Sequence, residues 1–275
     1  GMFKTVPALD DIYWSAPLKD FSLGSLPSSQ SDKTTPLGCH GGEKCNVIFD
    51  TGTSLIMVPS TAMSAVQDAL DKWRDISGDC TKLDQLPDLV FTLGGEKFTL
   101  PPQSYVGEIT GDLREIDPEL HRFMPHLREL GKRGRKAQDG GSSLRGTGSS
   151  EDTESEDLED DYSWEGSDDW SDVFGWGDNC VPLLMSLDLK TDKGQAYLMG
   201  IPFFREYYTT FKFRQQGTTT PDLVPESISI APKDEDCHPG WPSNKNLQAH
   251  SQERPRLRLD AAKLRVPSWV SKMMA

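Results

Sequence analysis

The 275-residue sequence predicts an all-β domain that carries a helix on its surface and is interrupted by a long acidic insertion. Short apolar runs separated by Gly and Pro turns recur on both sides of the middle of the chain, which is typical of β-rich folds. Residues 60–76 instead repeat apolar side chains at helical spacing. Residues 151–178 contain thirteen Asp or Glu and no Lys or Arg. Such a composition cannot bury enough apolar surface to offset the entropy lost on ordering.

The first strands are expected on either side of a glycine. Residues 11–23 are aromatic and alternate in polarity, which favours a strand pair. Residues 47–49 and 55–58 are short apolar runs that bracket Gly52. This pattern predicts two buried strands joined by a tight loop.

The helix and a hairpin follow. Ser60 is a suitable N-cap for the helix, and Gly78 stands just beyond its expected end. Residues 86–106, LPDLVFTLGGEKFTLPPQSYV, predict two strands around a Gly94-Gly95 turn. Residues 1–106 are therefore expected to form the first part of the folded domain.

Residues 107–179 are predicted to be an acidic, low-complexity insertion that is mostly disordered. Asp117-Pro118 is expected to start a helix, which Pro125 should kink. A basic Gly/Ser-rich linker and the acidic block with three tryptophans follow. Strand-like runs return in residues 180–236, the second part of the domain, and residues 237–275 form a polar, basic tail.

The charge of the chain restricts its partners. The formal net charge is −14, and the acidic block supplies nearly all of the excess. The remainder is close to neutral, which argues against nucleic acid as a partner.

No apolar run approaches the roughly 18 residues that span a bilayer. The first residues lack the apolar stretch of a signal peptide, so we expect the sequence to be a segment of a longer chain.

One motif points to chemistry. Asp50-Thr51-Gly52-Thr53-Ser54 follows an apolar strand and precedes LIMVPS. The motif resembles the second active-site motif of the pepsin-like aspartic proteases. IYW at residues 12–14, the hairpin at 86–106 and AYLMGIPFFREYYTTF at 196–211 resemble further blocks of that family, in family order. The resemblance covers about residues 6–232 and implies the C-terminal lobe of a bilobal, all-β acid protease fold.

The resemblance assigns a role to the residues of this loop. Asp50 would be one of two catalytic aspartates that share a proton and activate a water against a peptide carbonyl. Gly52 permits a tight backbone beside the carboxylate. Thr51, Thr53 and Ser54 supply hydroxyls, with Thr53 expected next to Asp50 and the substrate. Substrates would be extended polypeptides, and no metal or organic cofactor is expected. The alternative interpretation is a structural Asx-turn at the end of a strand.

The resemblance also pairs four of the five cysteines. Cys39 would join Cys45 just before the catalytic strand, and Cys80 would join Cys180 across the insertion; Cys237 has no counterpart. A metal site that uses Cys39, His40 and Cys45 is the alternative, but no fourth ligand is evident. Disulfides imply an oxidising compartment. We therefore expect the secretory pathway, with the protein secreted or held in an acidic endolysosomal or vacuolar lumen.

The second aspartate is not evident in the sequence. The nearest candidate, Asp139 in QDGGSS, lies between linker segments with no apolar strand to bury it. We therefore expect the partner to be a missing N-terminal lobe of the same protease, and the chain alone to be inactive. The alternative is a non-catalytic half-lobe that binds partners through its acidic, Trp-containing insertion. One departure from the family is that Ile201-Pro202 follows Gly200, where an acid is usual.

Overall fold

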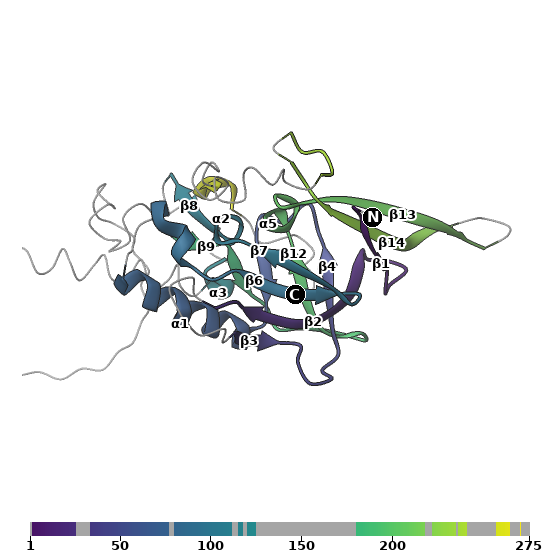
Figure 1. The fold of residues 1–275 in the computed structure, drawn as a ribbon, viewed down its shortest axis with the longest axis horizontal. Coiled ribbons are helices and arrows are strands. Elements are labelled where there is room, and N and C mark those ends of the chain that lie inside the picture. Colours follow the sequence, from purple (N-terminus) through teal and green to yellow (C-terminus); the bar gives the residue numbers. More distant parts are fainter. Residues whose placement is uncertain are drawn as a thin grey trace, which may run out of the picture.

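The structure is a computed structural model, which describes residues 2–25, 34–76, 80–111, 115–117, 120–124, 180–217, 222–234, 236–240, 257–264 and 270. Strands are the most common element among these residues and form three sheets (Figure 1). The prediction of an all-β fold is confirmed.

The largest sheet holds nine strands. Seven strands follow one another in the order β10-β5-β12-β4-β2-β6-β7, while β3 pairs with β2 and β11 pairs with β12. The strands are β2 (Ser15–Leu23), β3 (Thr35–Gly38), β4 (Cys45–Phe49), β5 (Ile56–Val58), β6 (Leu89–Leu93), β7 (Glu96–Leu100), β10 (Leu184–Ser186), β11 (Leu189–Thr191) and β12 (Gly194–Met199). The predicted hairpin is confirmed, because β6 and β7 pair around Gly94 and Gly95, both at positive φ.

The position of β12 shapes the site. It pairs in parallel with β4 on one side and antiparallel with β5 on the other. The chain that leaves β4 must therefore cross the end of β12 before it enters β5. Residues 50–55 make this crossing, and they contain the Asp-Thr-Gly motif.

The second sheet is three-stranded, with β14 in the middle. Its outer strands are β1 and β13, and β13 and β14 form a long hairpin that projects from the rest of the molecule (Figure 1). The strands are β1 (Lys4–Pro7), β13 (Tyr207–Gln216) and β14 (Asp222–Pro232).

The third sheet joins segments that the sequence placed in three different regions. Its strands are β8 (Val106–Thr110), β9 (Cys180–Pro182) and β15 (Leu257–Asp260), in the order β15-β8-β9. The packed domain thus extends into the ranges expected to be insertion and tail. The acidic block and most of the remaining insertion lie outside the described residues.

One long helix and several short ones accompany the sheets in the described residues. The predicted helix is confirmed as α1 (Ser60–Ile76). Ser60 is its first helical residue rather than its N-cap, and the backbone N–H of Ser60 donates to the Asp188 carboxylate at 2.9 Å. The remaining helices are short: η1 (Cys80–Gln85), α2 (Pro102–Tyr105), α3 (Leu120–Phe123), α5 (Ile201–Phe204) and η3 (Ala261–Lys263).

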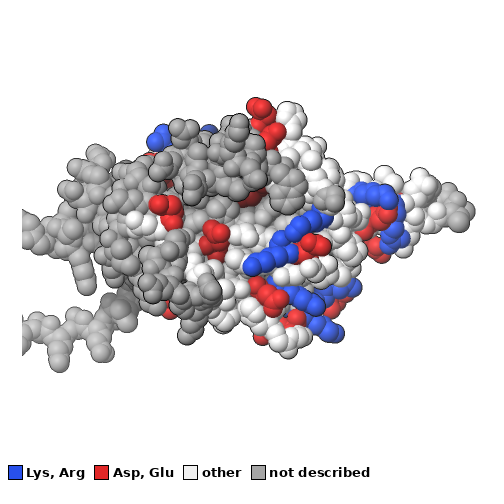
Figure 2. All heavy atoms as spheres, in the orientation of Figure 1, with Lys and Arg blue, Asp and Glu red and all other residues white. Residues whose placement is uncertain are grey.

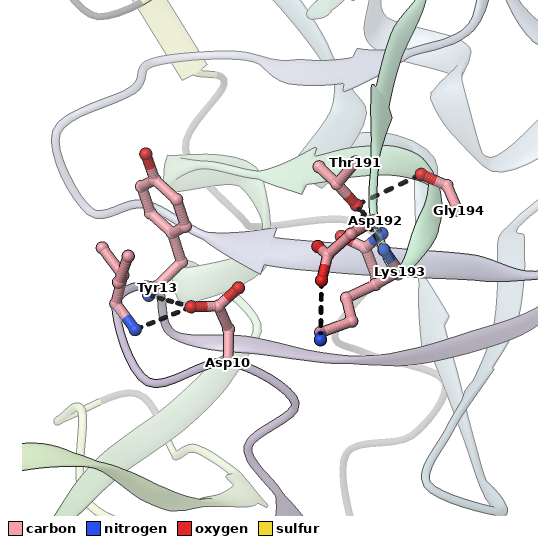
Figure 3. Close-up of polar contacts among 8 residues, drawn as sticks. Asp10, Tyr13, Thr191, Asp192, Lys193 and Gly194 are labelled. Atoms are coloured by element: carbon pink, nitrogen blue, oxygen red, sulfur yellow. Dashed lines mark hydrogen bonds and ion pairs between the residues drawn. The ribbon is translucent and has the colours of Figure 1, made fainter.

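The expected strand pair at residues 11–23 is wrong in its first part, since only β2 forms there. The Asp10 carboxylate accepts the backbone N–H groups of Ile12 at 2.7 Å and Tyr13 at 3.3 Å (Figure 3). This Asx-turn reverses the chain before β2 begins. Ile12 is therefore 79% exposed and Tyr13 is 52% exposed.

Two apolar clusters form the core. The main cluster joins the large sheet, its helices and the second sheet, and includes Phe21, Phe91 and Phe203. The second cluster, here called the second core, lies between the third sheet and the β5–β12 region. Its members are Leu55, Met57, Ile109, Ile116, Leu120, Phe123, Met124, Val181, Leu183, Met185, Leu198, Ala261, Leu264 and Val270.

A buried polar network ties α2 to the start of β13. The Tyr105 hydroxyl donates to the Pro87 carbonyl at 2.5 Å, and the Ser104 hydroxyl donates to the Glu206 carboxylate. Burial, and secondarily the charge of Glu206, raises the pKa of Asp88 above its ordinary 3.8. Both Ser104 and Tyr105 are fully buried.

The raised pKa of Asp88 predicts that acid stabilises this part of the fold. The folded state binds this proton at a higher pH than the unfolded state does. Stability is therefore gained as the pH falls through the raised pKa towards 3.8, and is lost again as the pH rises. We expect Asp88→Asn to flatten the rise in urea midpoint between neutral pH and pH 4. Asp222→Asn, at an exposed position, is the control; equal pH profiles for wild type and Asp88→Asn would contradict this.

Candidate active site

The crossing loop, residues 50–55, is fixed to the end of β12 by backbone hydrogen bonds. The Asp50 N–H donates to the Met199 carbonyl at 3.1 Å, and the Ile201 N–H donates to the Thr53 carbonyl at 2.8 Å. Both bonds join the loop to residues that flank Gly200. The loop is thus held at the carboxyl ends of the parallel strands β4 and β12.

Two donors of the same loop hold the Asp50 carboxylate. Its Oδ1 accepts the Gly52 N–H at 2.8 Å, and its Oδ2 accepts the Thr53 hydroxyl at 2.7 Å. Asp50 is half-buried, while Thr53 is only 2% exposed. Each carboxylate oxygen therefore has a fixed local partner, and charge-assisted bonds of this kind are about twice as strong as neutral ones.

The loop places the other motif residues around this carboxylate. Gly52 lies so close that a Cβ there would be 3.2 Å from Asp50 Oδ1, tighter than ordinary contact. Thr51 is exposed and Ser54 is half-buried. The Asx-turn anticipated as the alternative is present, since the Asp50 carboxylate accepts from Gly52 two residues on. That geometry is compatible with both a structural and a chemical role.

Gly200 is a site residue that the sequence singled out only as the glycine before Ile201-Pro202. A Cβ at this position would lie 2.2 Å from the Leu55 carbonyl oxygen and 2.3 Å from the Thr53 carbonyl oxygen. No side chain fits between the loop and the end of β12. The close approach of the loop to β12 thus depends on this glycine.

The departure from the family at Ile201-Pro202 leaves the loop's anchoring intact. The contact from residue 201 to Thr53 is made by the backbone N–H, which any residue except proline supplies. Pro202 lies in the first turn of α5, where an N–H has no partner within the helix. The change therefore removes a side-chain acid without removing the backbone bond.

The residues at the two ends of the loop pack into the apolar core. Phe49, the residue before Asp50, is 5% exposed and packs against Phe203 with ring centroids 5.1 Å apart. Leu55, at the other end of the loop, belongs to the second core. The carboxylate thus lies at the edge of two closely packed clusters, which limits its movement.

The expected disulfide between Cys39 and Cys45 is confirmed. It closes the loop immediately before β4 and takes up both cysteines that the alternative metal site required. The side chains of Cys80 and Cys180 lie outside the described residues, so their pairing stays a prediction. Cys237 is a free, exposed cysteine.

Thr53→Val is expected to loosen the Asp50 carboxylate without changing the shape of the loop. The substitution removes the hydroxyl donor from a buried position and leaves Oδ2 without it. Hydrogen bonds to charged groups contribute about 1.5–3 kcal/mol, so we expect a loss of this size in urea unfolding. Thr53→Ser retains the hydroxyl and is the matched control. The interpretation is contradicted if Val and Ser variants are equally stable.

Among the described residues, no helix is both long and apolar enough to cross a membrane.

The family model for eukaryotic aspartyl protease matches residues 1–113. Bovine pepsin A (Bos taurus) is 31% identical over 115 residues, which cover 40% of this chain and 28% of that protein. A probable vacuolar protease A of Arthroderma benhamiae is 34% identical over 115 residues, 40% of this chain and 26% of that protein.

Pepsin A of Sus scrofa matches more of the chain, with 23% identity over 215 residues, 77% of this chain and 36% of that protein. The crystal structure of aspartic proteinase from Irpex lacteus covers 84% of this chain and 47% of its own, with 15% identity and a TM-score of 0.38. The chain thus spans about a quarter to a third of the length of the curated relatives named here. Over the residues that match the family model, 1–113, the chain is similar to the pepsin-like eukaryotic aspartyl proteases.

Proposed function

We propose that this chain supplies one half of the active site of an aspartic endopeptidase, with Asp50 as one of two catalytic carboxylates. The observation that carries the proposal is the geometry of Asp50. Its carboxylate is held by the Gly52 N–H and the Thr53 hydroxyl at the end of two parallel strands. A carboxylate fixed in this way is oriented before substrate arrives, which is what acid–base catalysis requires.

The reaction needs a second carboxylate facing Asp50. Two such groups at close range cannot both be ionised, so they share one proton. The ionised carboxylate takes a proton from a water as the water oxygen attacks the peptide carbonyl carbon, and the protonated carboxylic acid gives its proton to the carbonyl oxygen. The tetrahedral diol then breaks at the C–N bond: the protonated carboxylic acid gives its proton to the leaving nitrogen, and the ionised carboxylate takes a proton from one diol hydroxyl, which becomes the carbonyl of the new carboxylic acid, so the dyad again holds one proton. Asp50 provides one of these two groups.

The second sheet supports the inference that another lobe of the same protease covers this chain. Large apolar side chains on and beside that sheet are exposed, with Leu223 at 63%, Phe213 at 50% and Phe3 at 40%. Trp14, just before the start of β2, packs against Phe213 with ring centroids 4.8 Å apart. The Trp14 carbonyl accepts the N–H of Phe49, the residue before Asp50, so the apolar side chains reach towards the Asp50 loop. Exposed large apolar side chains that gather on one sheet are a feature of interfaces.

The surface charges fit a polypeptide-processing enzyme better than a nucleic-acid binder. On the face in Figure 2, Lys and Arg side chains lie beside Asp and Glu rather than in a patch of one sign. Ion pairs such as Lys212 with Glu226 and Arg214 with Asp11, both at 2.7 Å, illustrate this mixing. This mixing argues against nucleic acid as a partner, and the Cys39–Cys45 disulfide supports an oxidising, secreted or lumenal location.

The alternative, a half-lobe that binds partners through its acidic insertion without catalysis, makes a different prediction. The test assays cleavage of a denatured polypeptide at pH 4–6 by this 275-residue chain and by the complete product of its gene. We expect cleavage by the complete product only, and unchanged cleavage after residues 151–178 are deleted. No cleavage by either protein would reject the proposal. Activity of the chain alone that rises with the square of its concentration would reject the missing lobe in favour of self-pairing.

A further inference from the structure

The edge of β8 accepts the C-terminal segment of this chain as an added strand. Residues 257–260 pair in parallel with β8, from Leu257 opposite Gly107 to Asp260 opposite Thr110. In Figure 1 the yellow C-terminal turn lies beside β8. About 150 residues separate the two strands along the chain, so nothing in the local sequence requires them to meet.

The contacts between the two strands are specific to this register. The Arg258 guanidinium pairs with the Glu108 carboxylate at 3.0 Å, and Glu108 is only 17% exposed. The Thr110 hydroxyl donates to the Leu259 carbonyl at 3.4 Å. A Cβ on Gly107 would lie 2.8 Å from the Leu257 carbonyl oxygen, so β8 has its glycine where the added strand comes closest.

The segment beyond β15 turns into the second core. The Asp260 carboxylate accepts the Ala262 N–H at 3.1 Å and starts the η3 turn, which carries Ala261 and Leu264 inward. Ala261 and Val270 are fully buried, and Leu264 is 2% exposed. These three side chains pack in the second core together with apolar side chains from the insertion and from β9.

The same cluster supports the back of the crossing loop. Leu55, the last loop residue, and Met57 on β5 are second-core members, as is Leu198 beside Met57 on β12. The Ile56 N–H donates to the Leu183 carbonyl at 2.9 Å, which links β5 to the start of β10 next to the third sheet. Displacement of Ala261, Leu264 and Val270 would thus remove apolar contacts from the cluster that contains Leu55 of the Asp50 loop.

We propose that residues 257–264 and 270 form a separable strap: residues 257–260 bind the β8 edge as an exchangeable strand, and the side chains of Ala261, Leu264 and Val270 hold the Asp50 loop in its observed position through the second core. The partner of the β8 edge is thus this chain's own C-terminal segment. The inference concerns local stability of the loop and does not depend on proteolytic activity.

The first test measures hydrogen exchange by mass spectrometry on the 275-residue chain and on a chain that ends at residue 256. Exchange at residues 106–110 and 55–58 is expected to rise about tenfold or more in the shortened chain, while the β6–β7 hairpin stays protected. Adding a synthetic peptide of residues 255–272 is expected to restore protection at both segments. Unchanged exchange at 55–58, or an equal rise in β6–β7, would overturn the proposal.

A point variant tests the same coupling without shortening the chain. Leu264→Asp places a charge in the second core, and we expect it to reproduce the exchange pattern of the shortened chain. Lys263→Ala is the matched control, because Lys263 is the adjacent residue and its side chain is 82% exposed. If Leu264→Asp leaves residues 55–58 as protected as Lys263→Ala does, the strap does not hold the loop.

Register is tested by binding the labelled peptide to the shortened chain in fluorescence anisotropy. A peptide with Arg258→Glu is expected to bind about two- to fivefold more weakly, and Glu108→Arg in the chain is expected to recover that loss. Gly107→Ala is expected to weaken binding of both peptides. Equal binding of the two peptides to both chains would show that the segment does not dock in this register.

Discussion

Asp50→Asn in the complete gene product is expected to lower kcat for peptide cleavage by about 10²- to 10⁴-fold, the usual effect of losing one acid–base group. The amide cannot accept the proton of the attacking water, so the dyad loses one member. The fold should be retained, because the Asn carbonyl can still accept the Gly52 N–H that Asp50 Oδ1 accepts at 2.8 Å, and the Asn amide N–H can donate to the Thr53 hydroxyl in place of the bond that Oδ2 accepts from it. Peptide cleavage at acidic pH, with urea unfolding in parallel, measures both effects.

Asp192→Asn is the matched control for that experiment. Asp192 lies in the exposed turn between β11 and β12, where it pairs with Lys193 at 2.8 Å (Figure 3). This turn is at the opposite end of β12 from Asp50. Wild-type activity is therefore expected for Asp192→Asn. If Asp50→Asn also retained wild-type activity, Asp50 would have no part in catalysis.

Gly200→Ala is expected to give the largest loss of stability in the site. The φ of Gly200 is −93°, so alanine is compatible with its backbone, and the effect is a pure contact effect. The new methyl group would overlap the Thr53 and Leu55 carbonyl oxygens, at 2.3 and 2.2 Å. Overpacking of this kind costs about 1–3 kcal/mol or more, and relief requires the Asp50 loop to move off β12.

Urea unfolding and cleavage activity together check this prediction. Gly24→Ala serves as the control, because the nearest atom to its added Cβ would be 3.4 Å away, at the edge of ordinary contact. We expect Gly200→Ala to lose both stability and activity, and Gly24→Ala to lose little of either. Equal urea midpoints for the two variants would mean that the loop does not need its close approach to β12.

The local parts of the fold were predictable from the sequence. The hairpin at β6 and β7 follows from alternating residues around a Gly94-Gly95 pair whose φ values are +57° and +92°. Helix α1 follows from apolar residues at helical spacing. The loop from Asp50 to Ser54 follows from an apolar strand, a carboxylate and a glycine in succession. Each of these signals lies within about twenty residues.

The parts that the sequence did not predict depend on contacts between distant segments. The pairing of Leu257 with Gly107 joins two short strands with no shared turn, so neither strand indicates its partner. The steric role of Gly200 is visible only when the loop lies across β12. At residues 11–14 a strand-like composition gave way to an Asx-turn at Asp10, because a side-chain acceptor competes with strand pairing.

A structure of the complete gene product tests the central claim most directly. The claim is that Asp50 works as one member of a carboxylate pair. The measured quantity is the distance from the Asp50 carboxylate oxygens to the group that faces them. We expect a second Asp or Glu oxygen at hydrogen-bonding distance, about 2.6–3.2 Å, directly or through one shared water. An apolar side chain or a lysine in that position would contradict it.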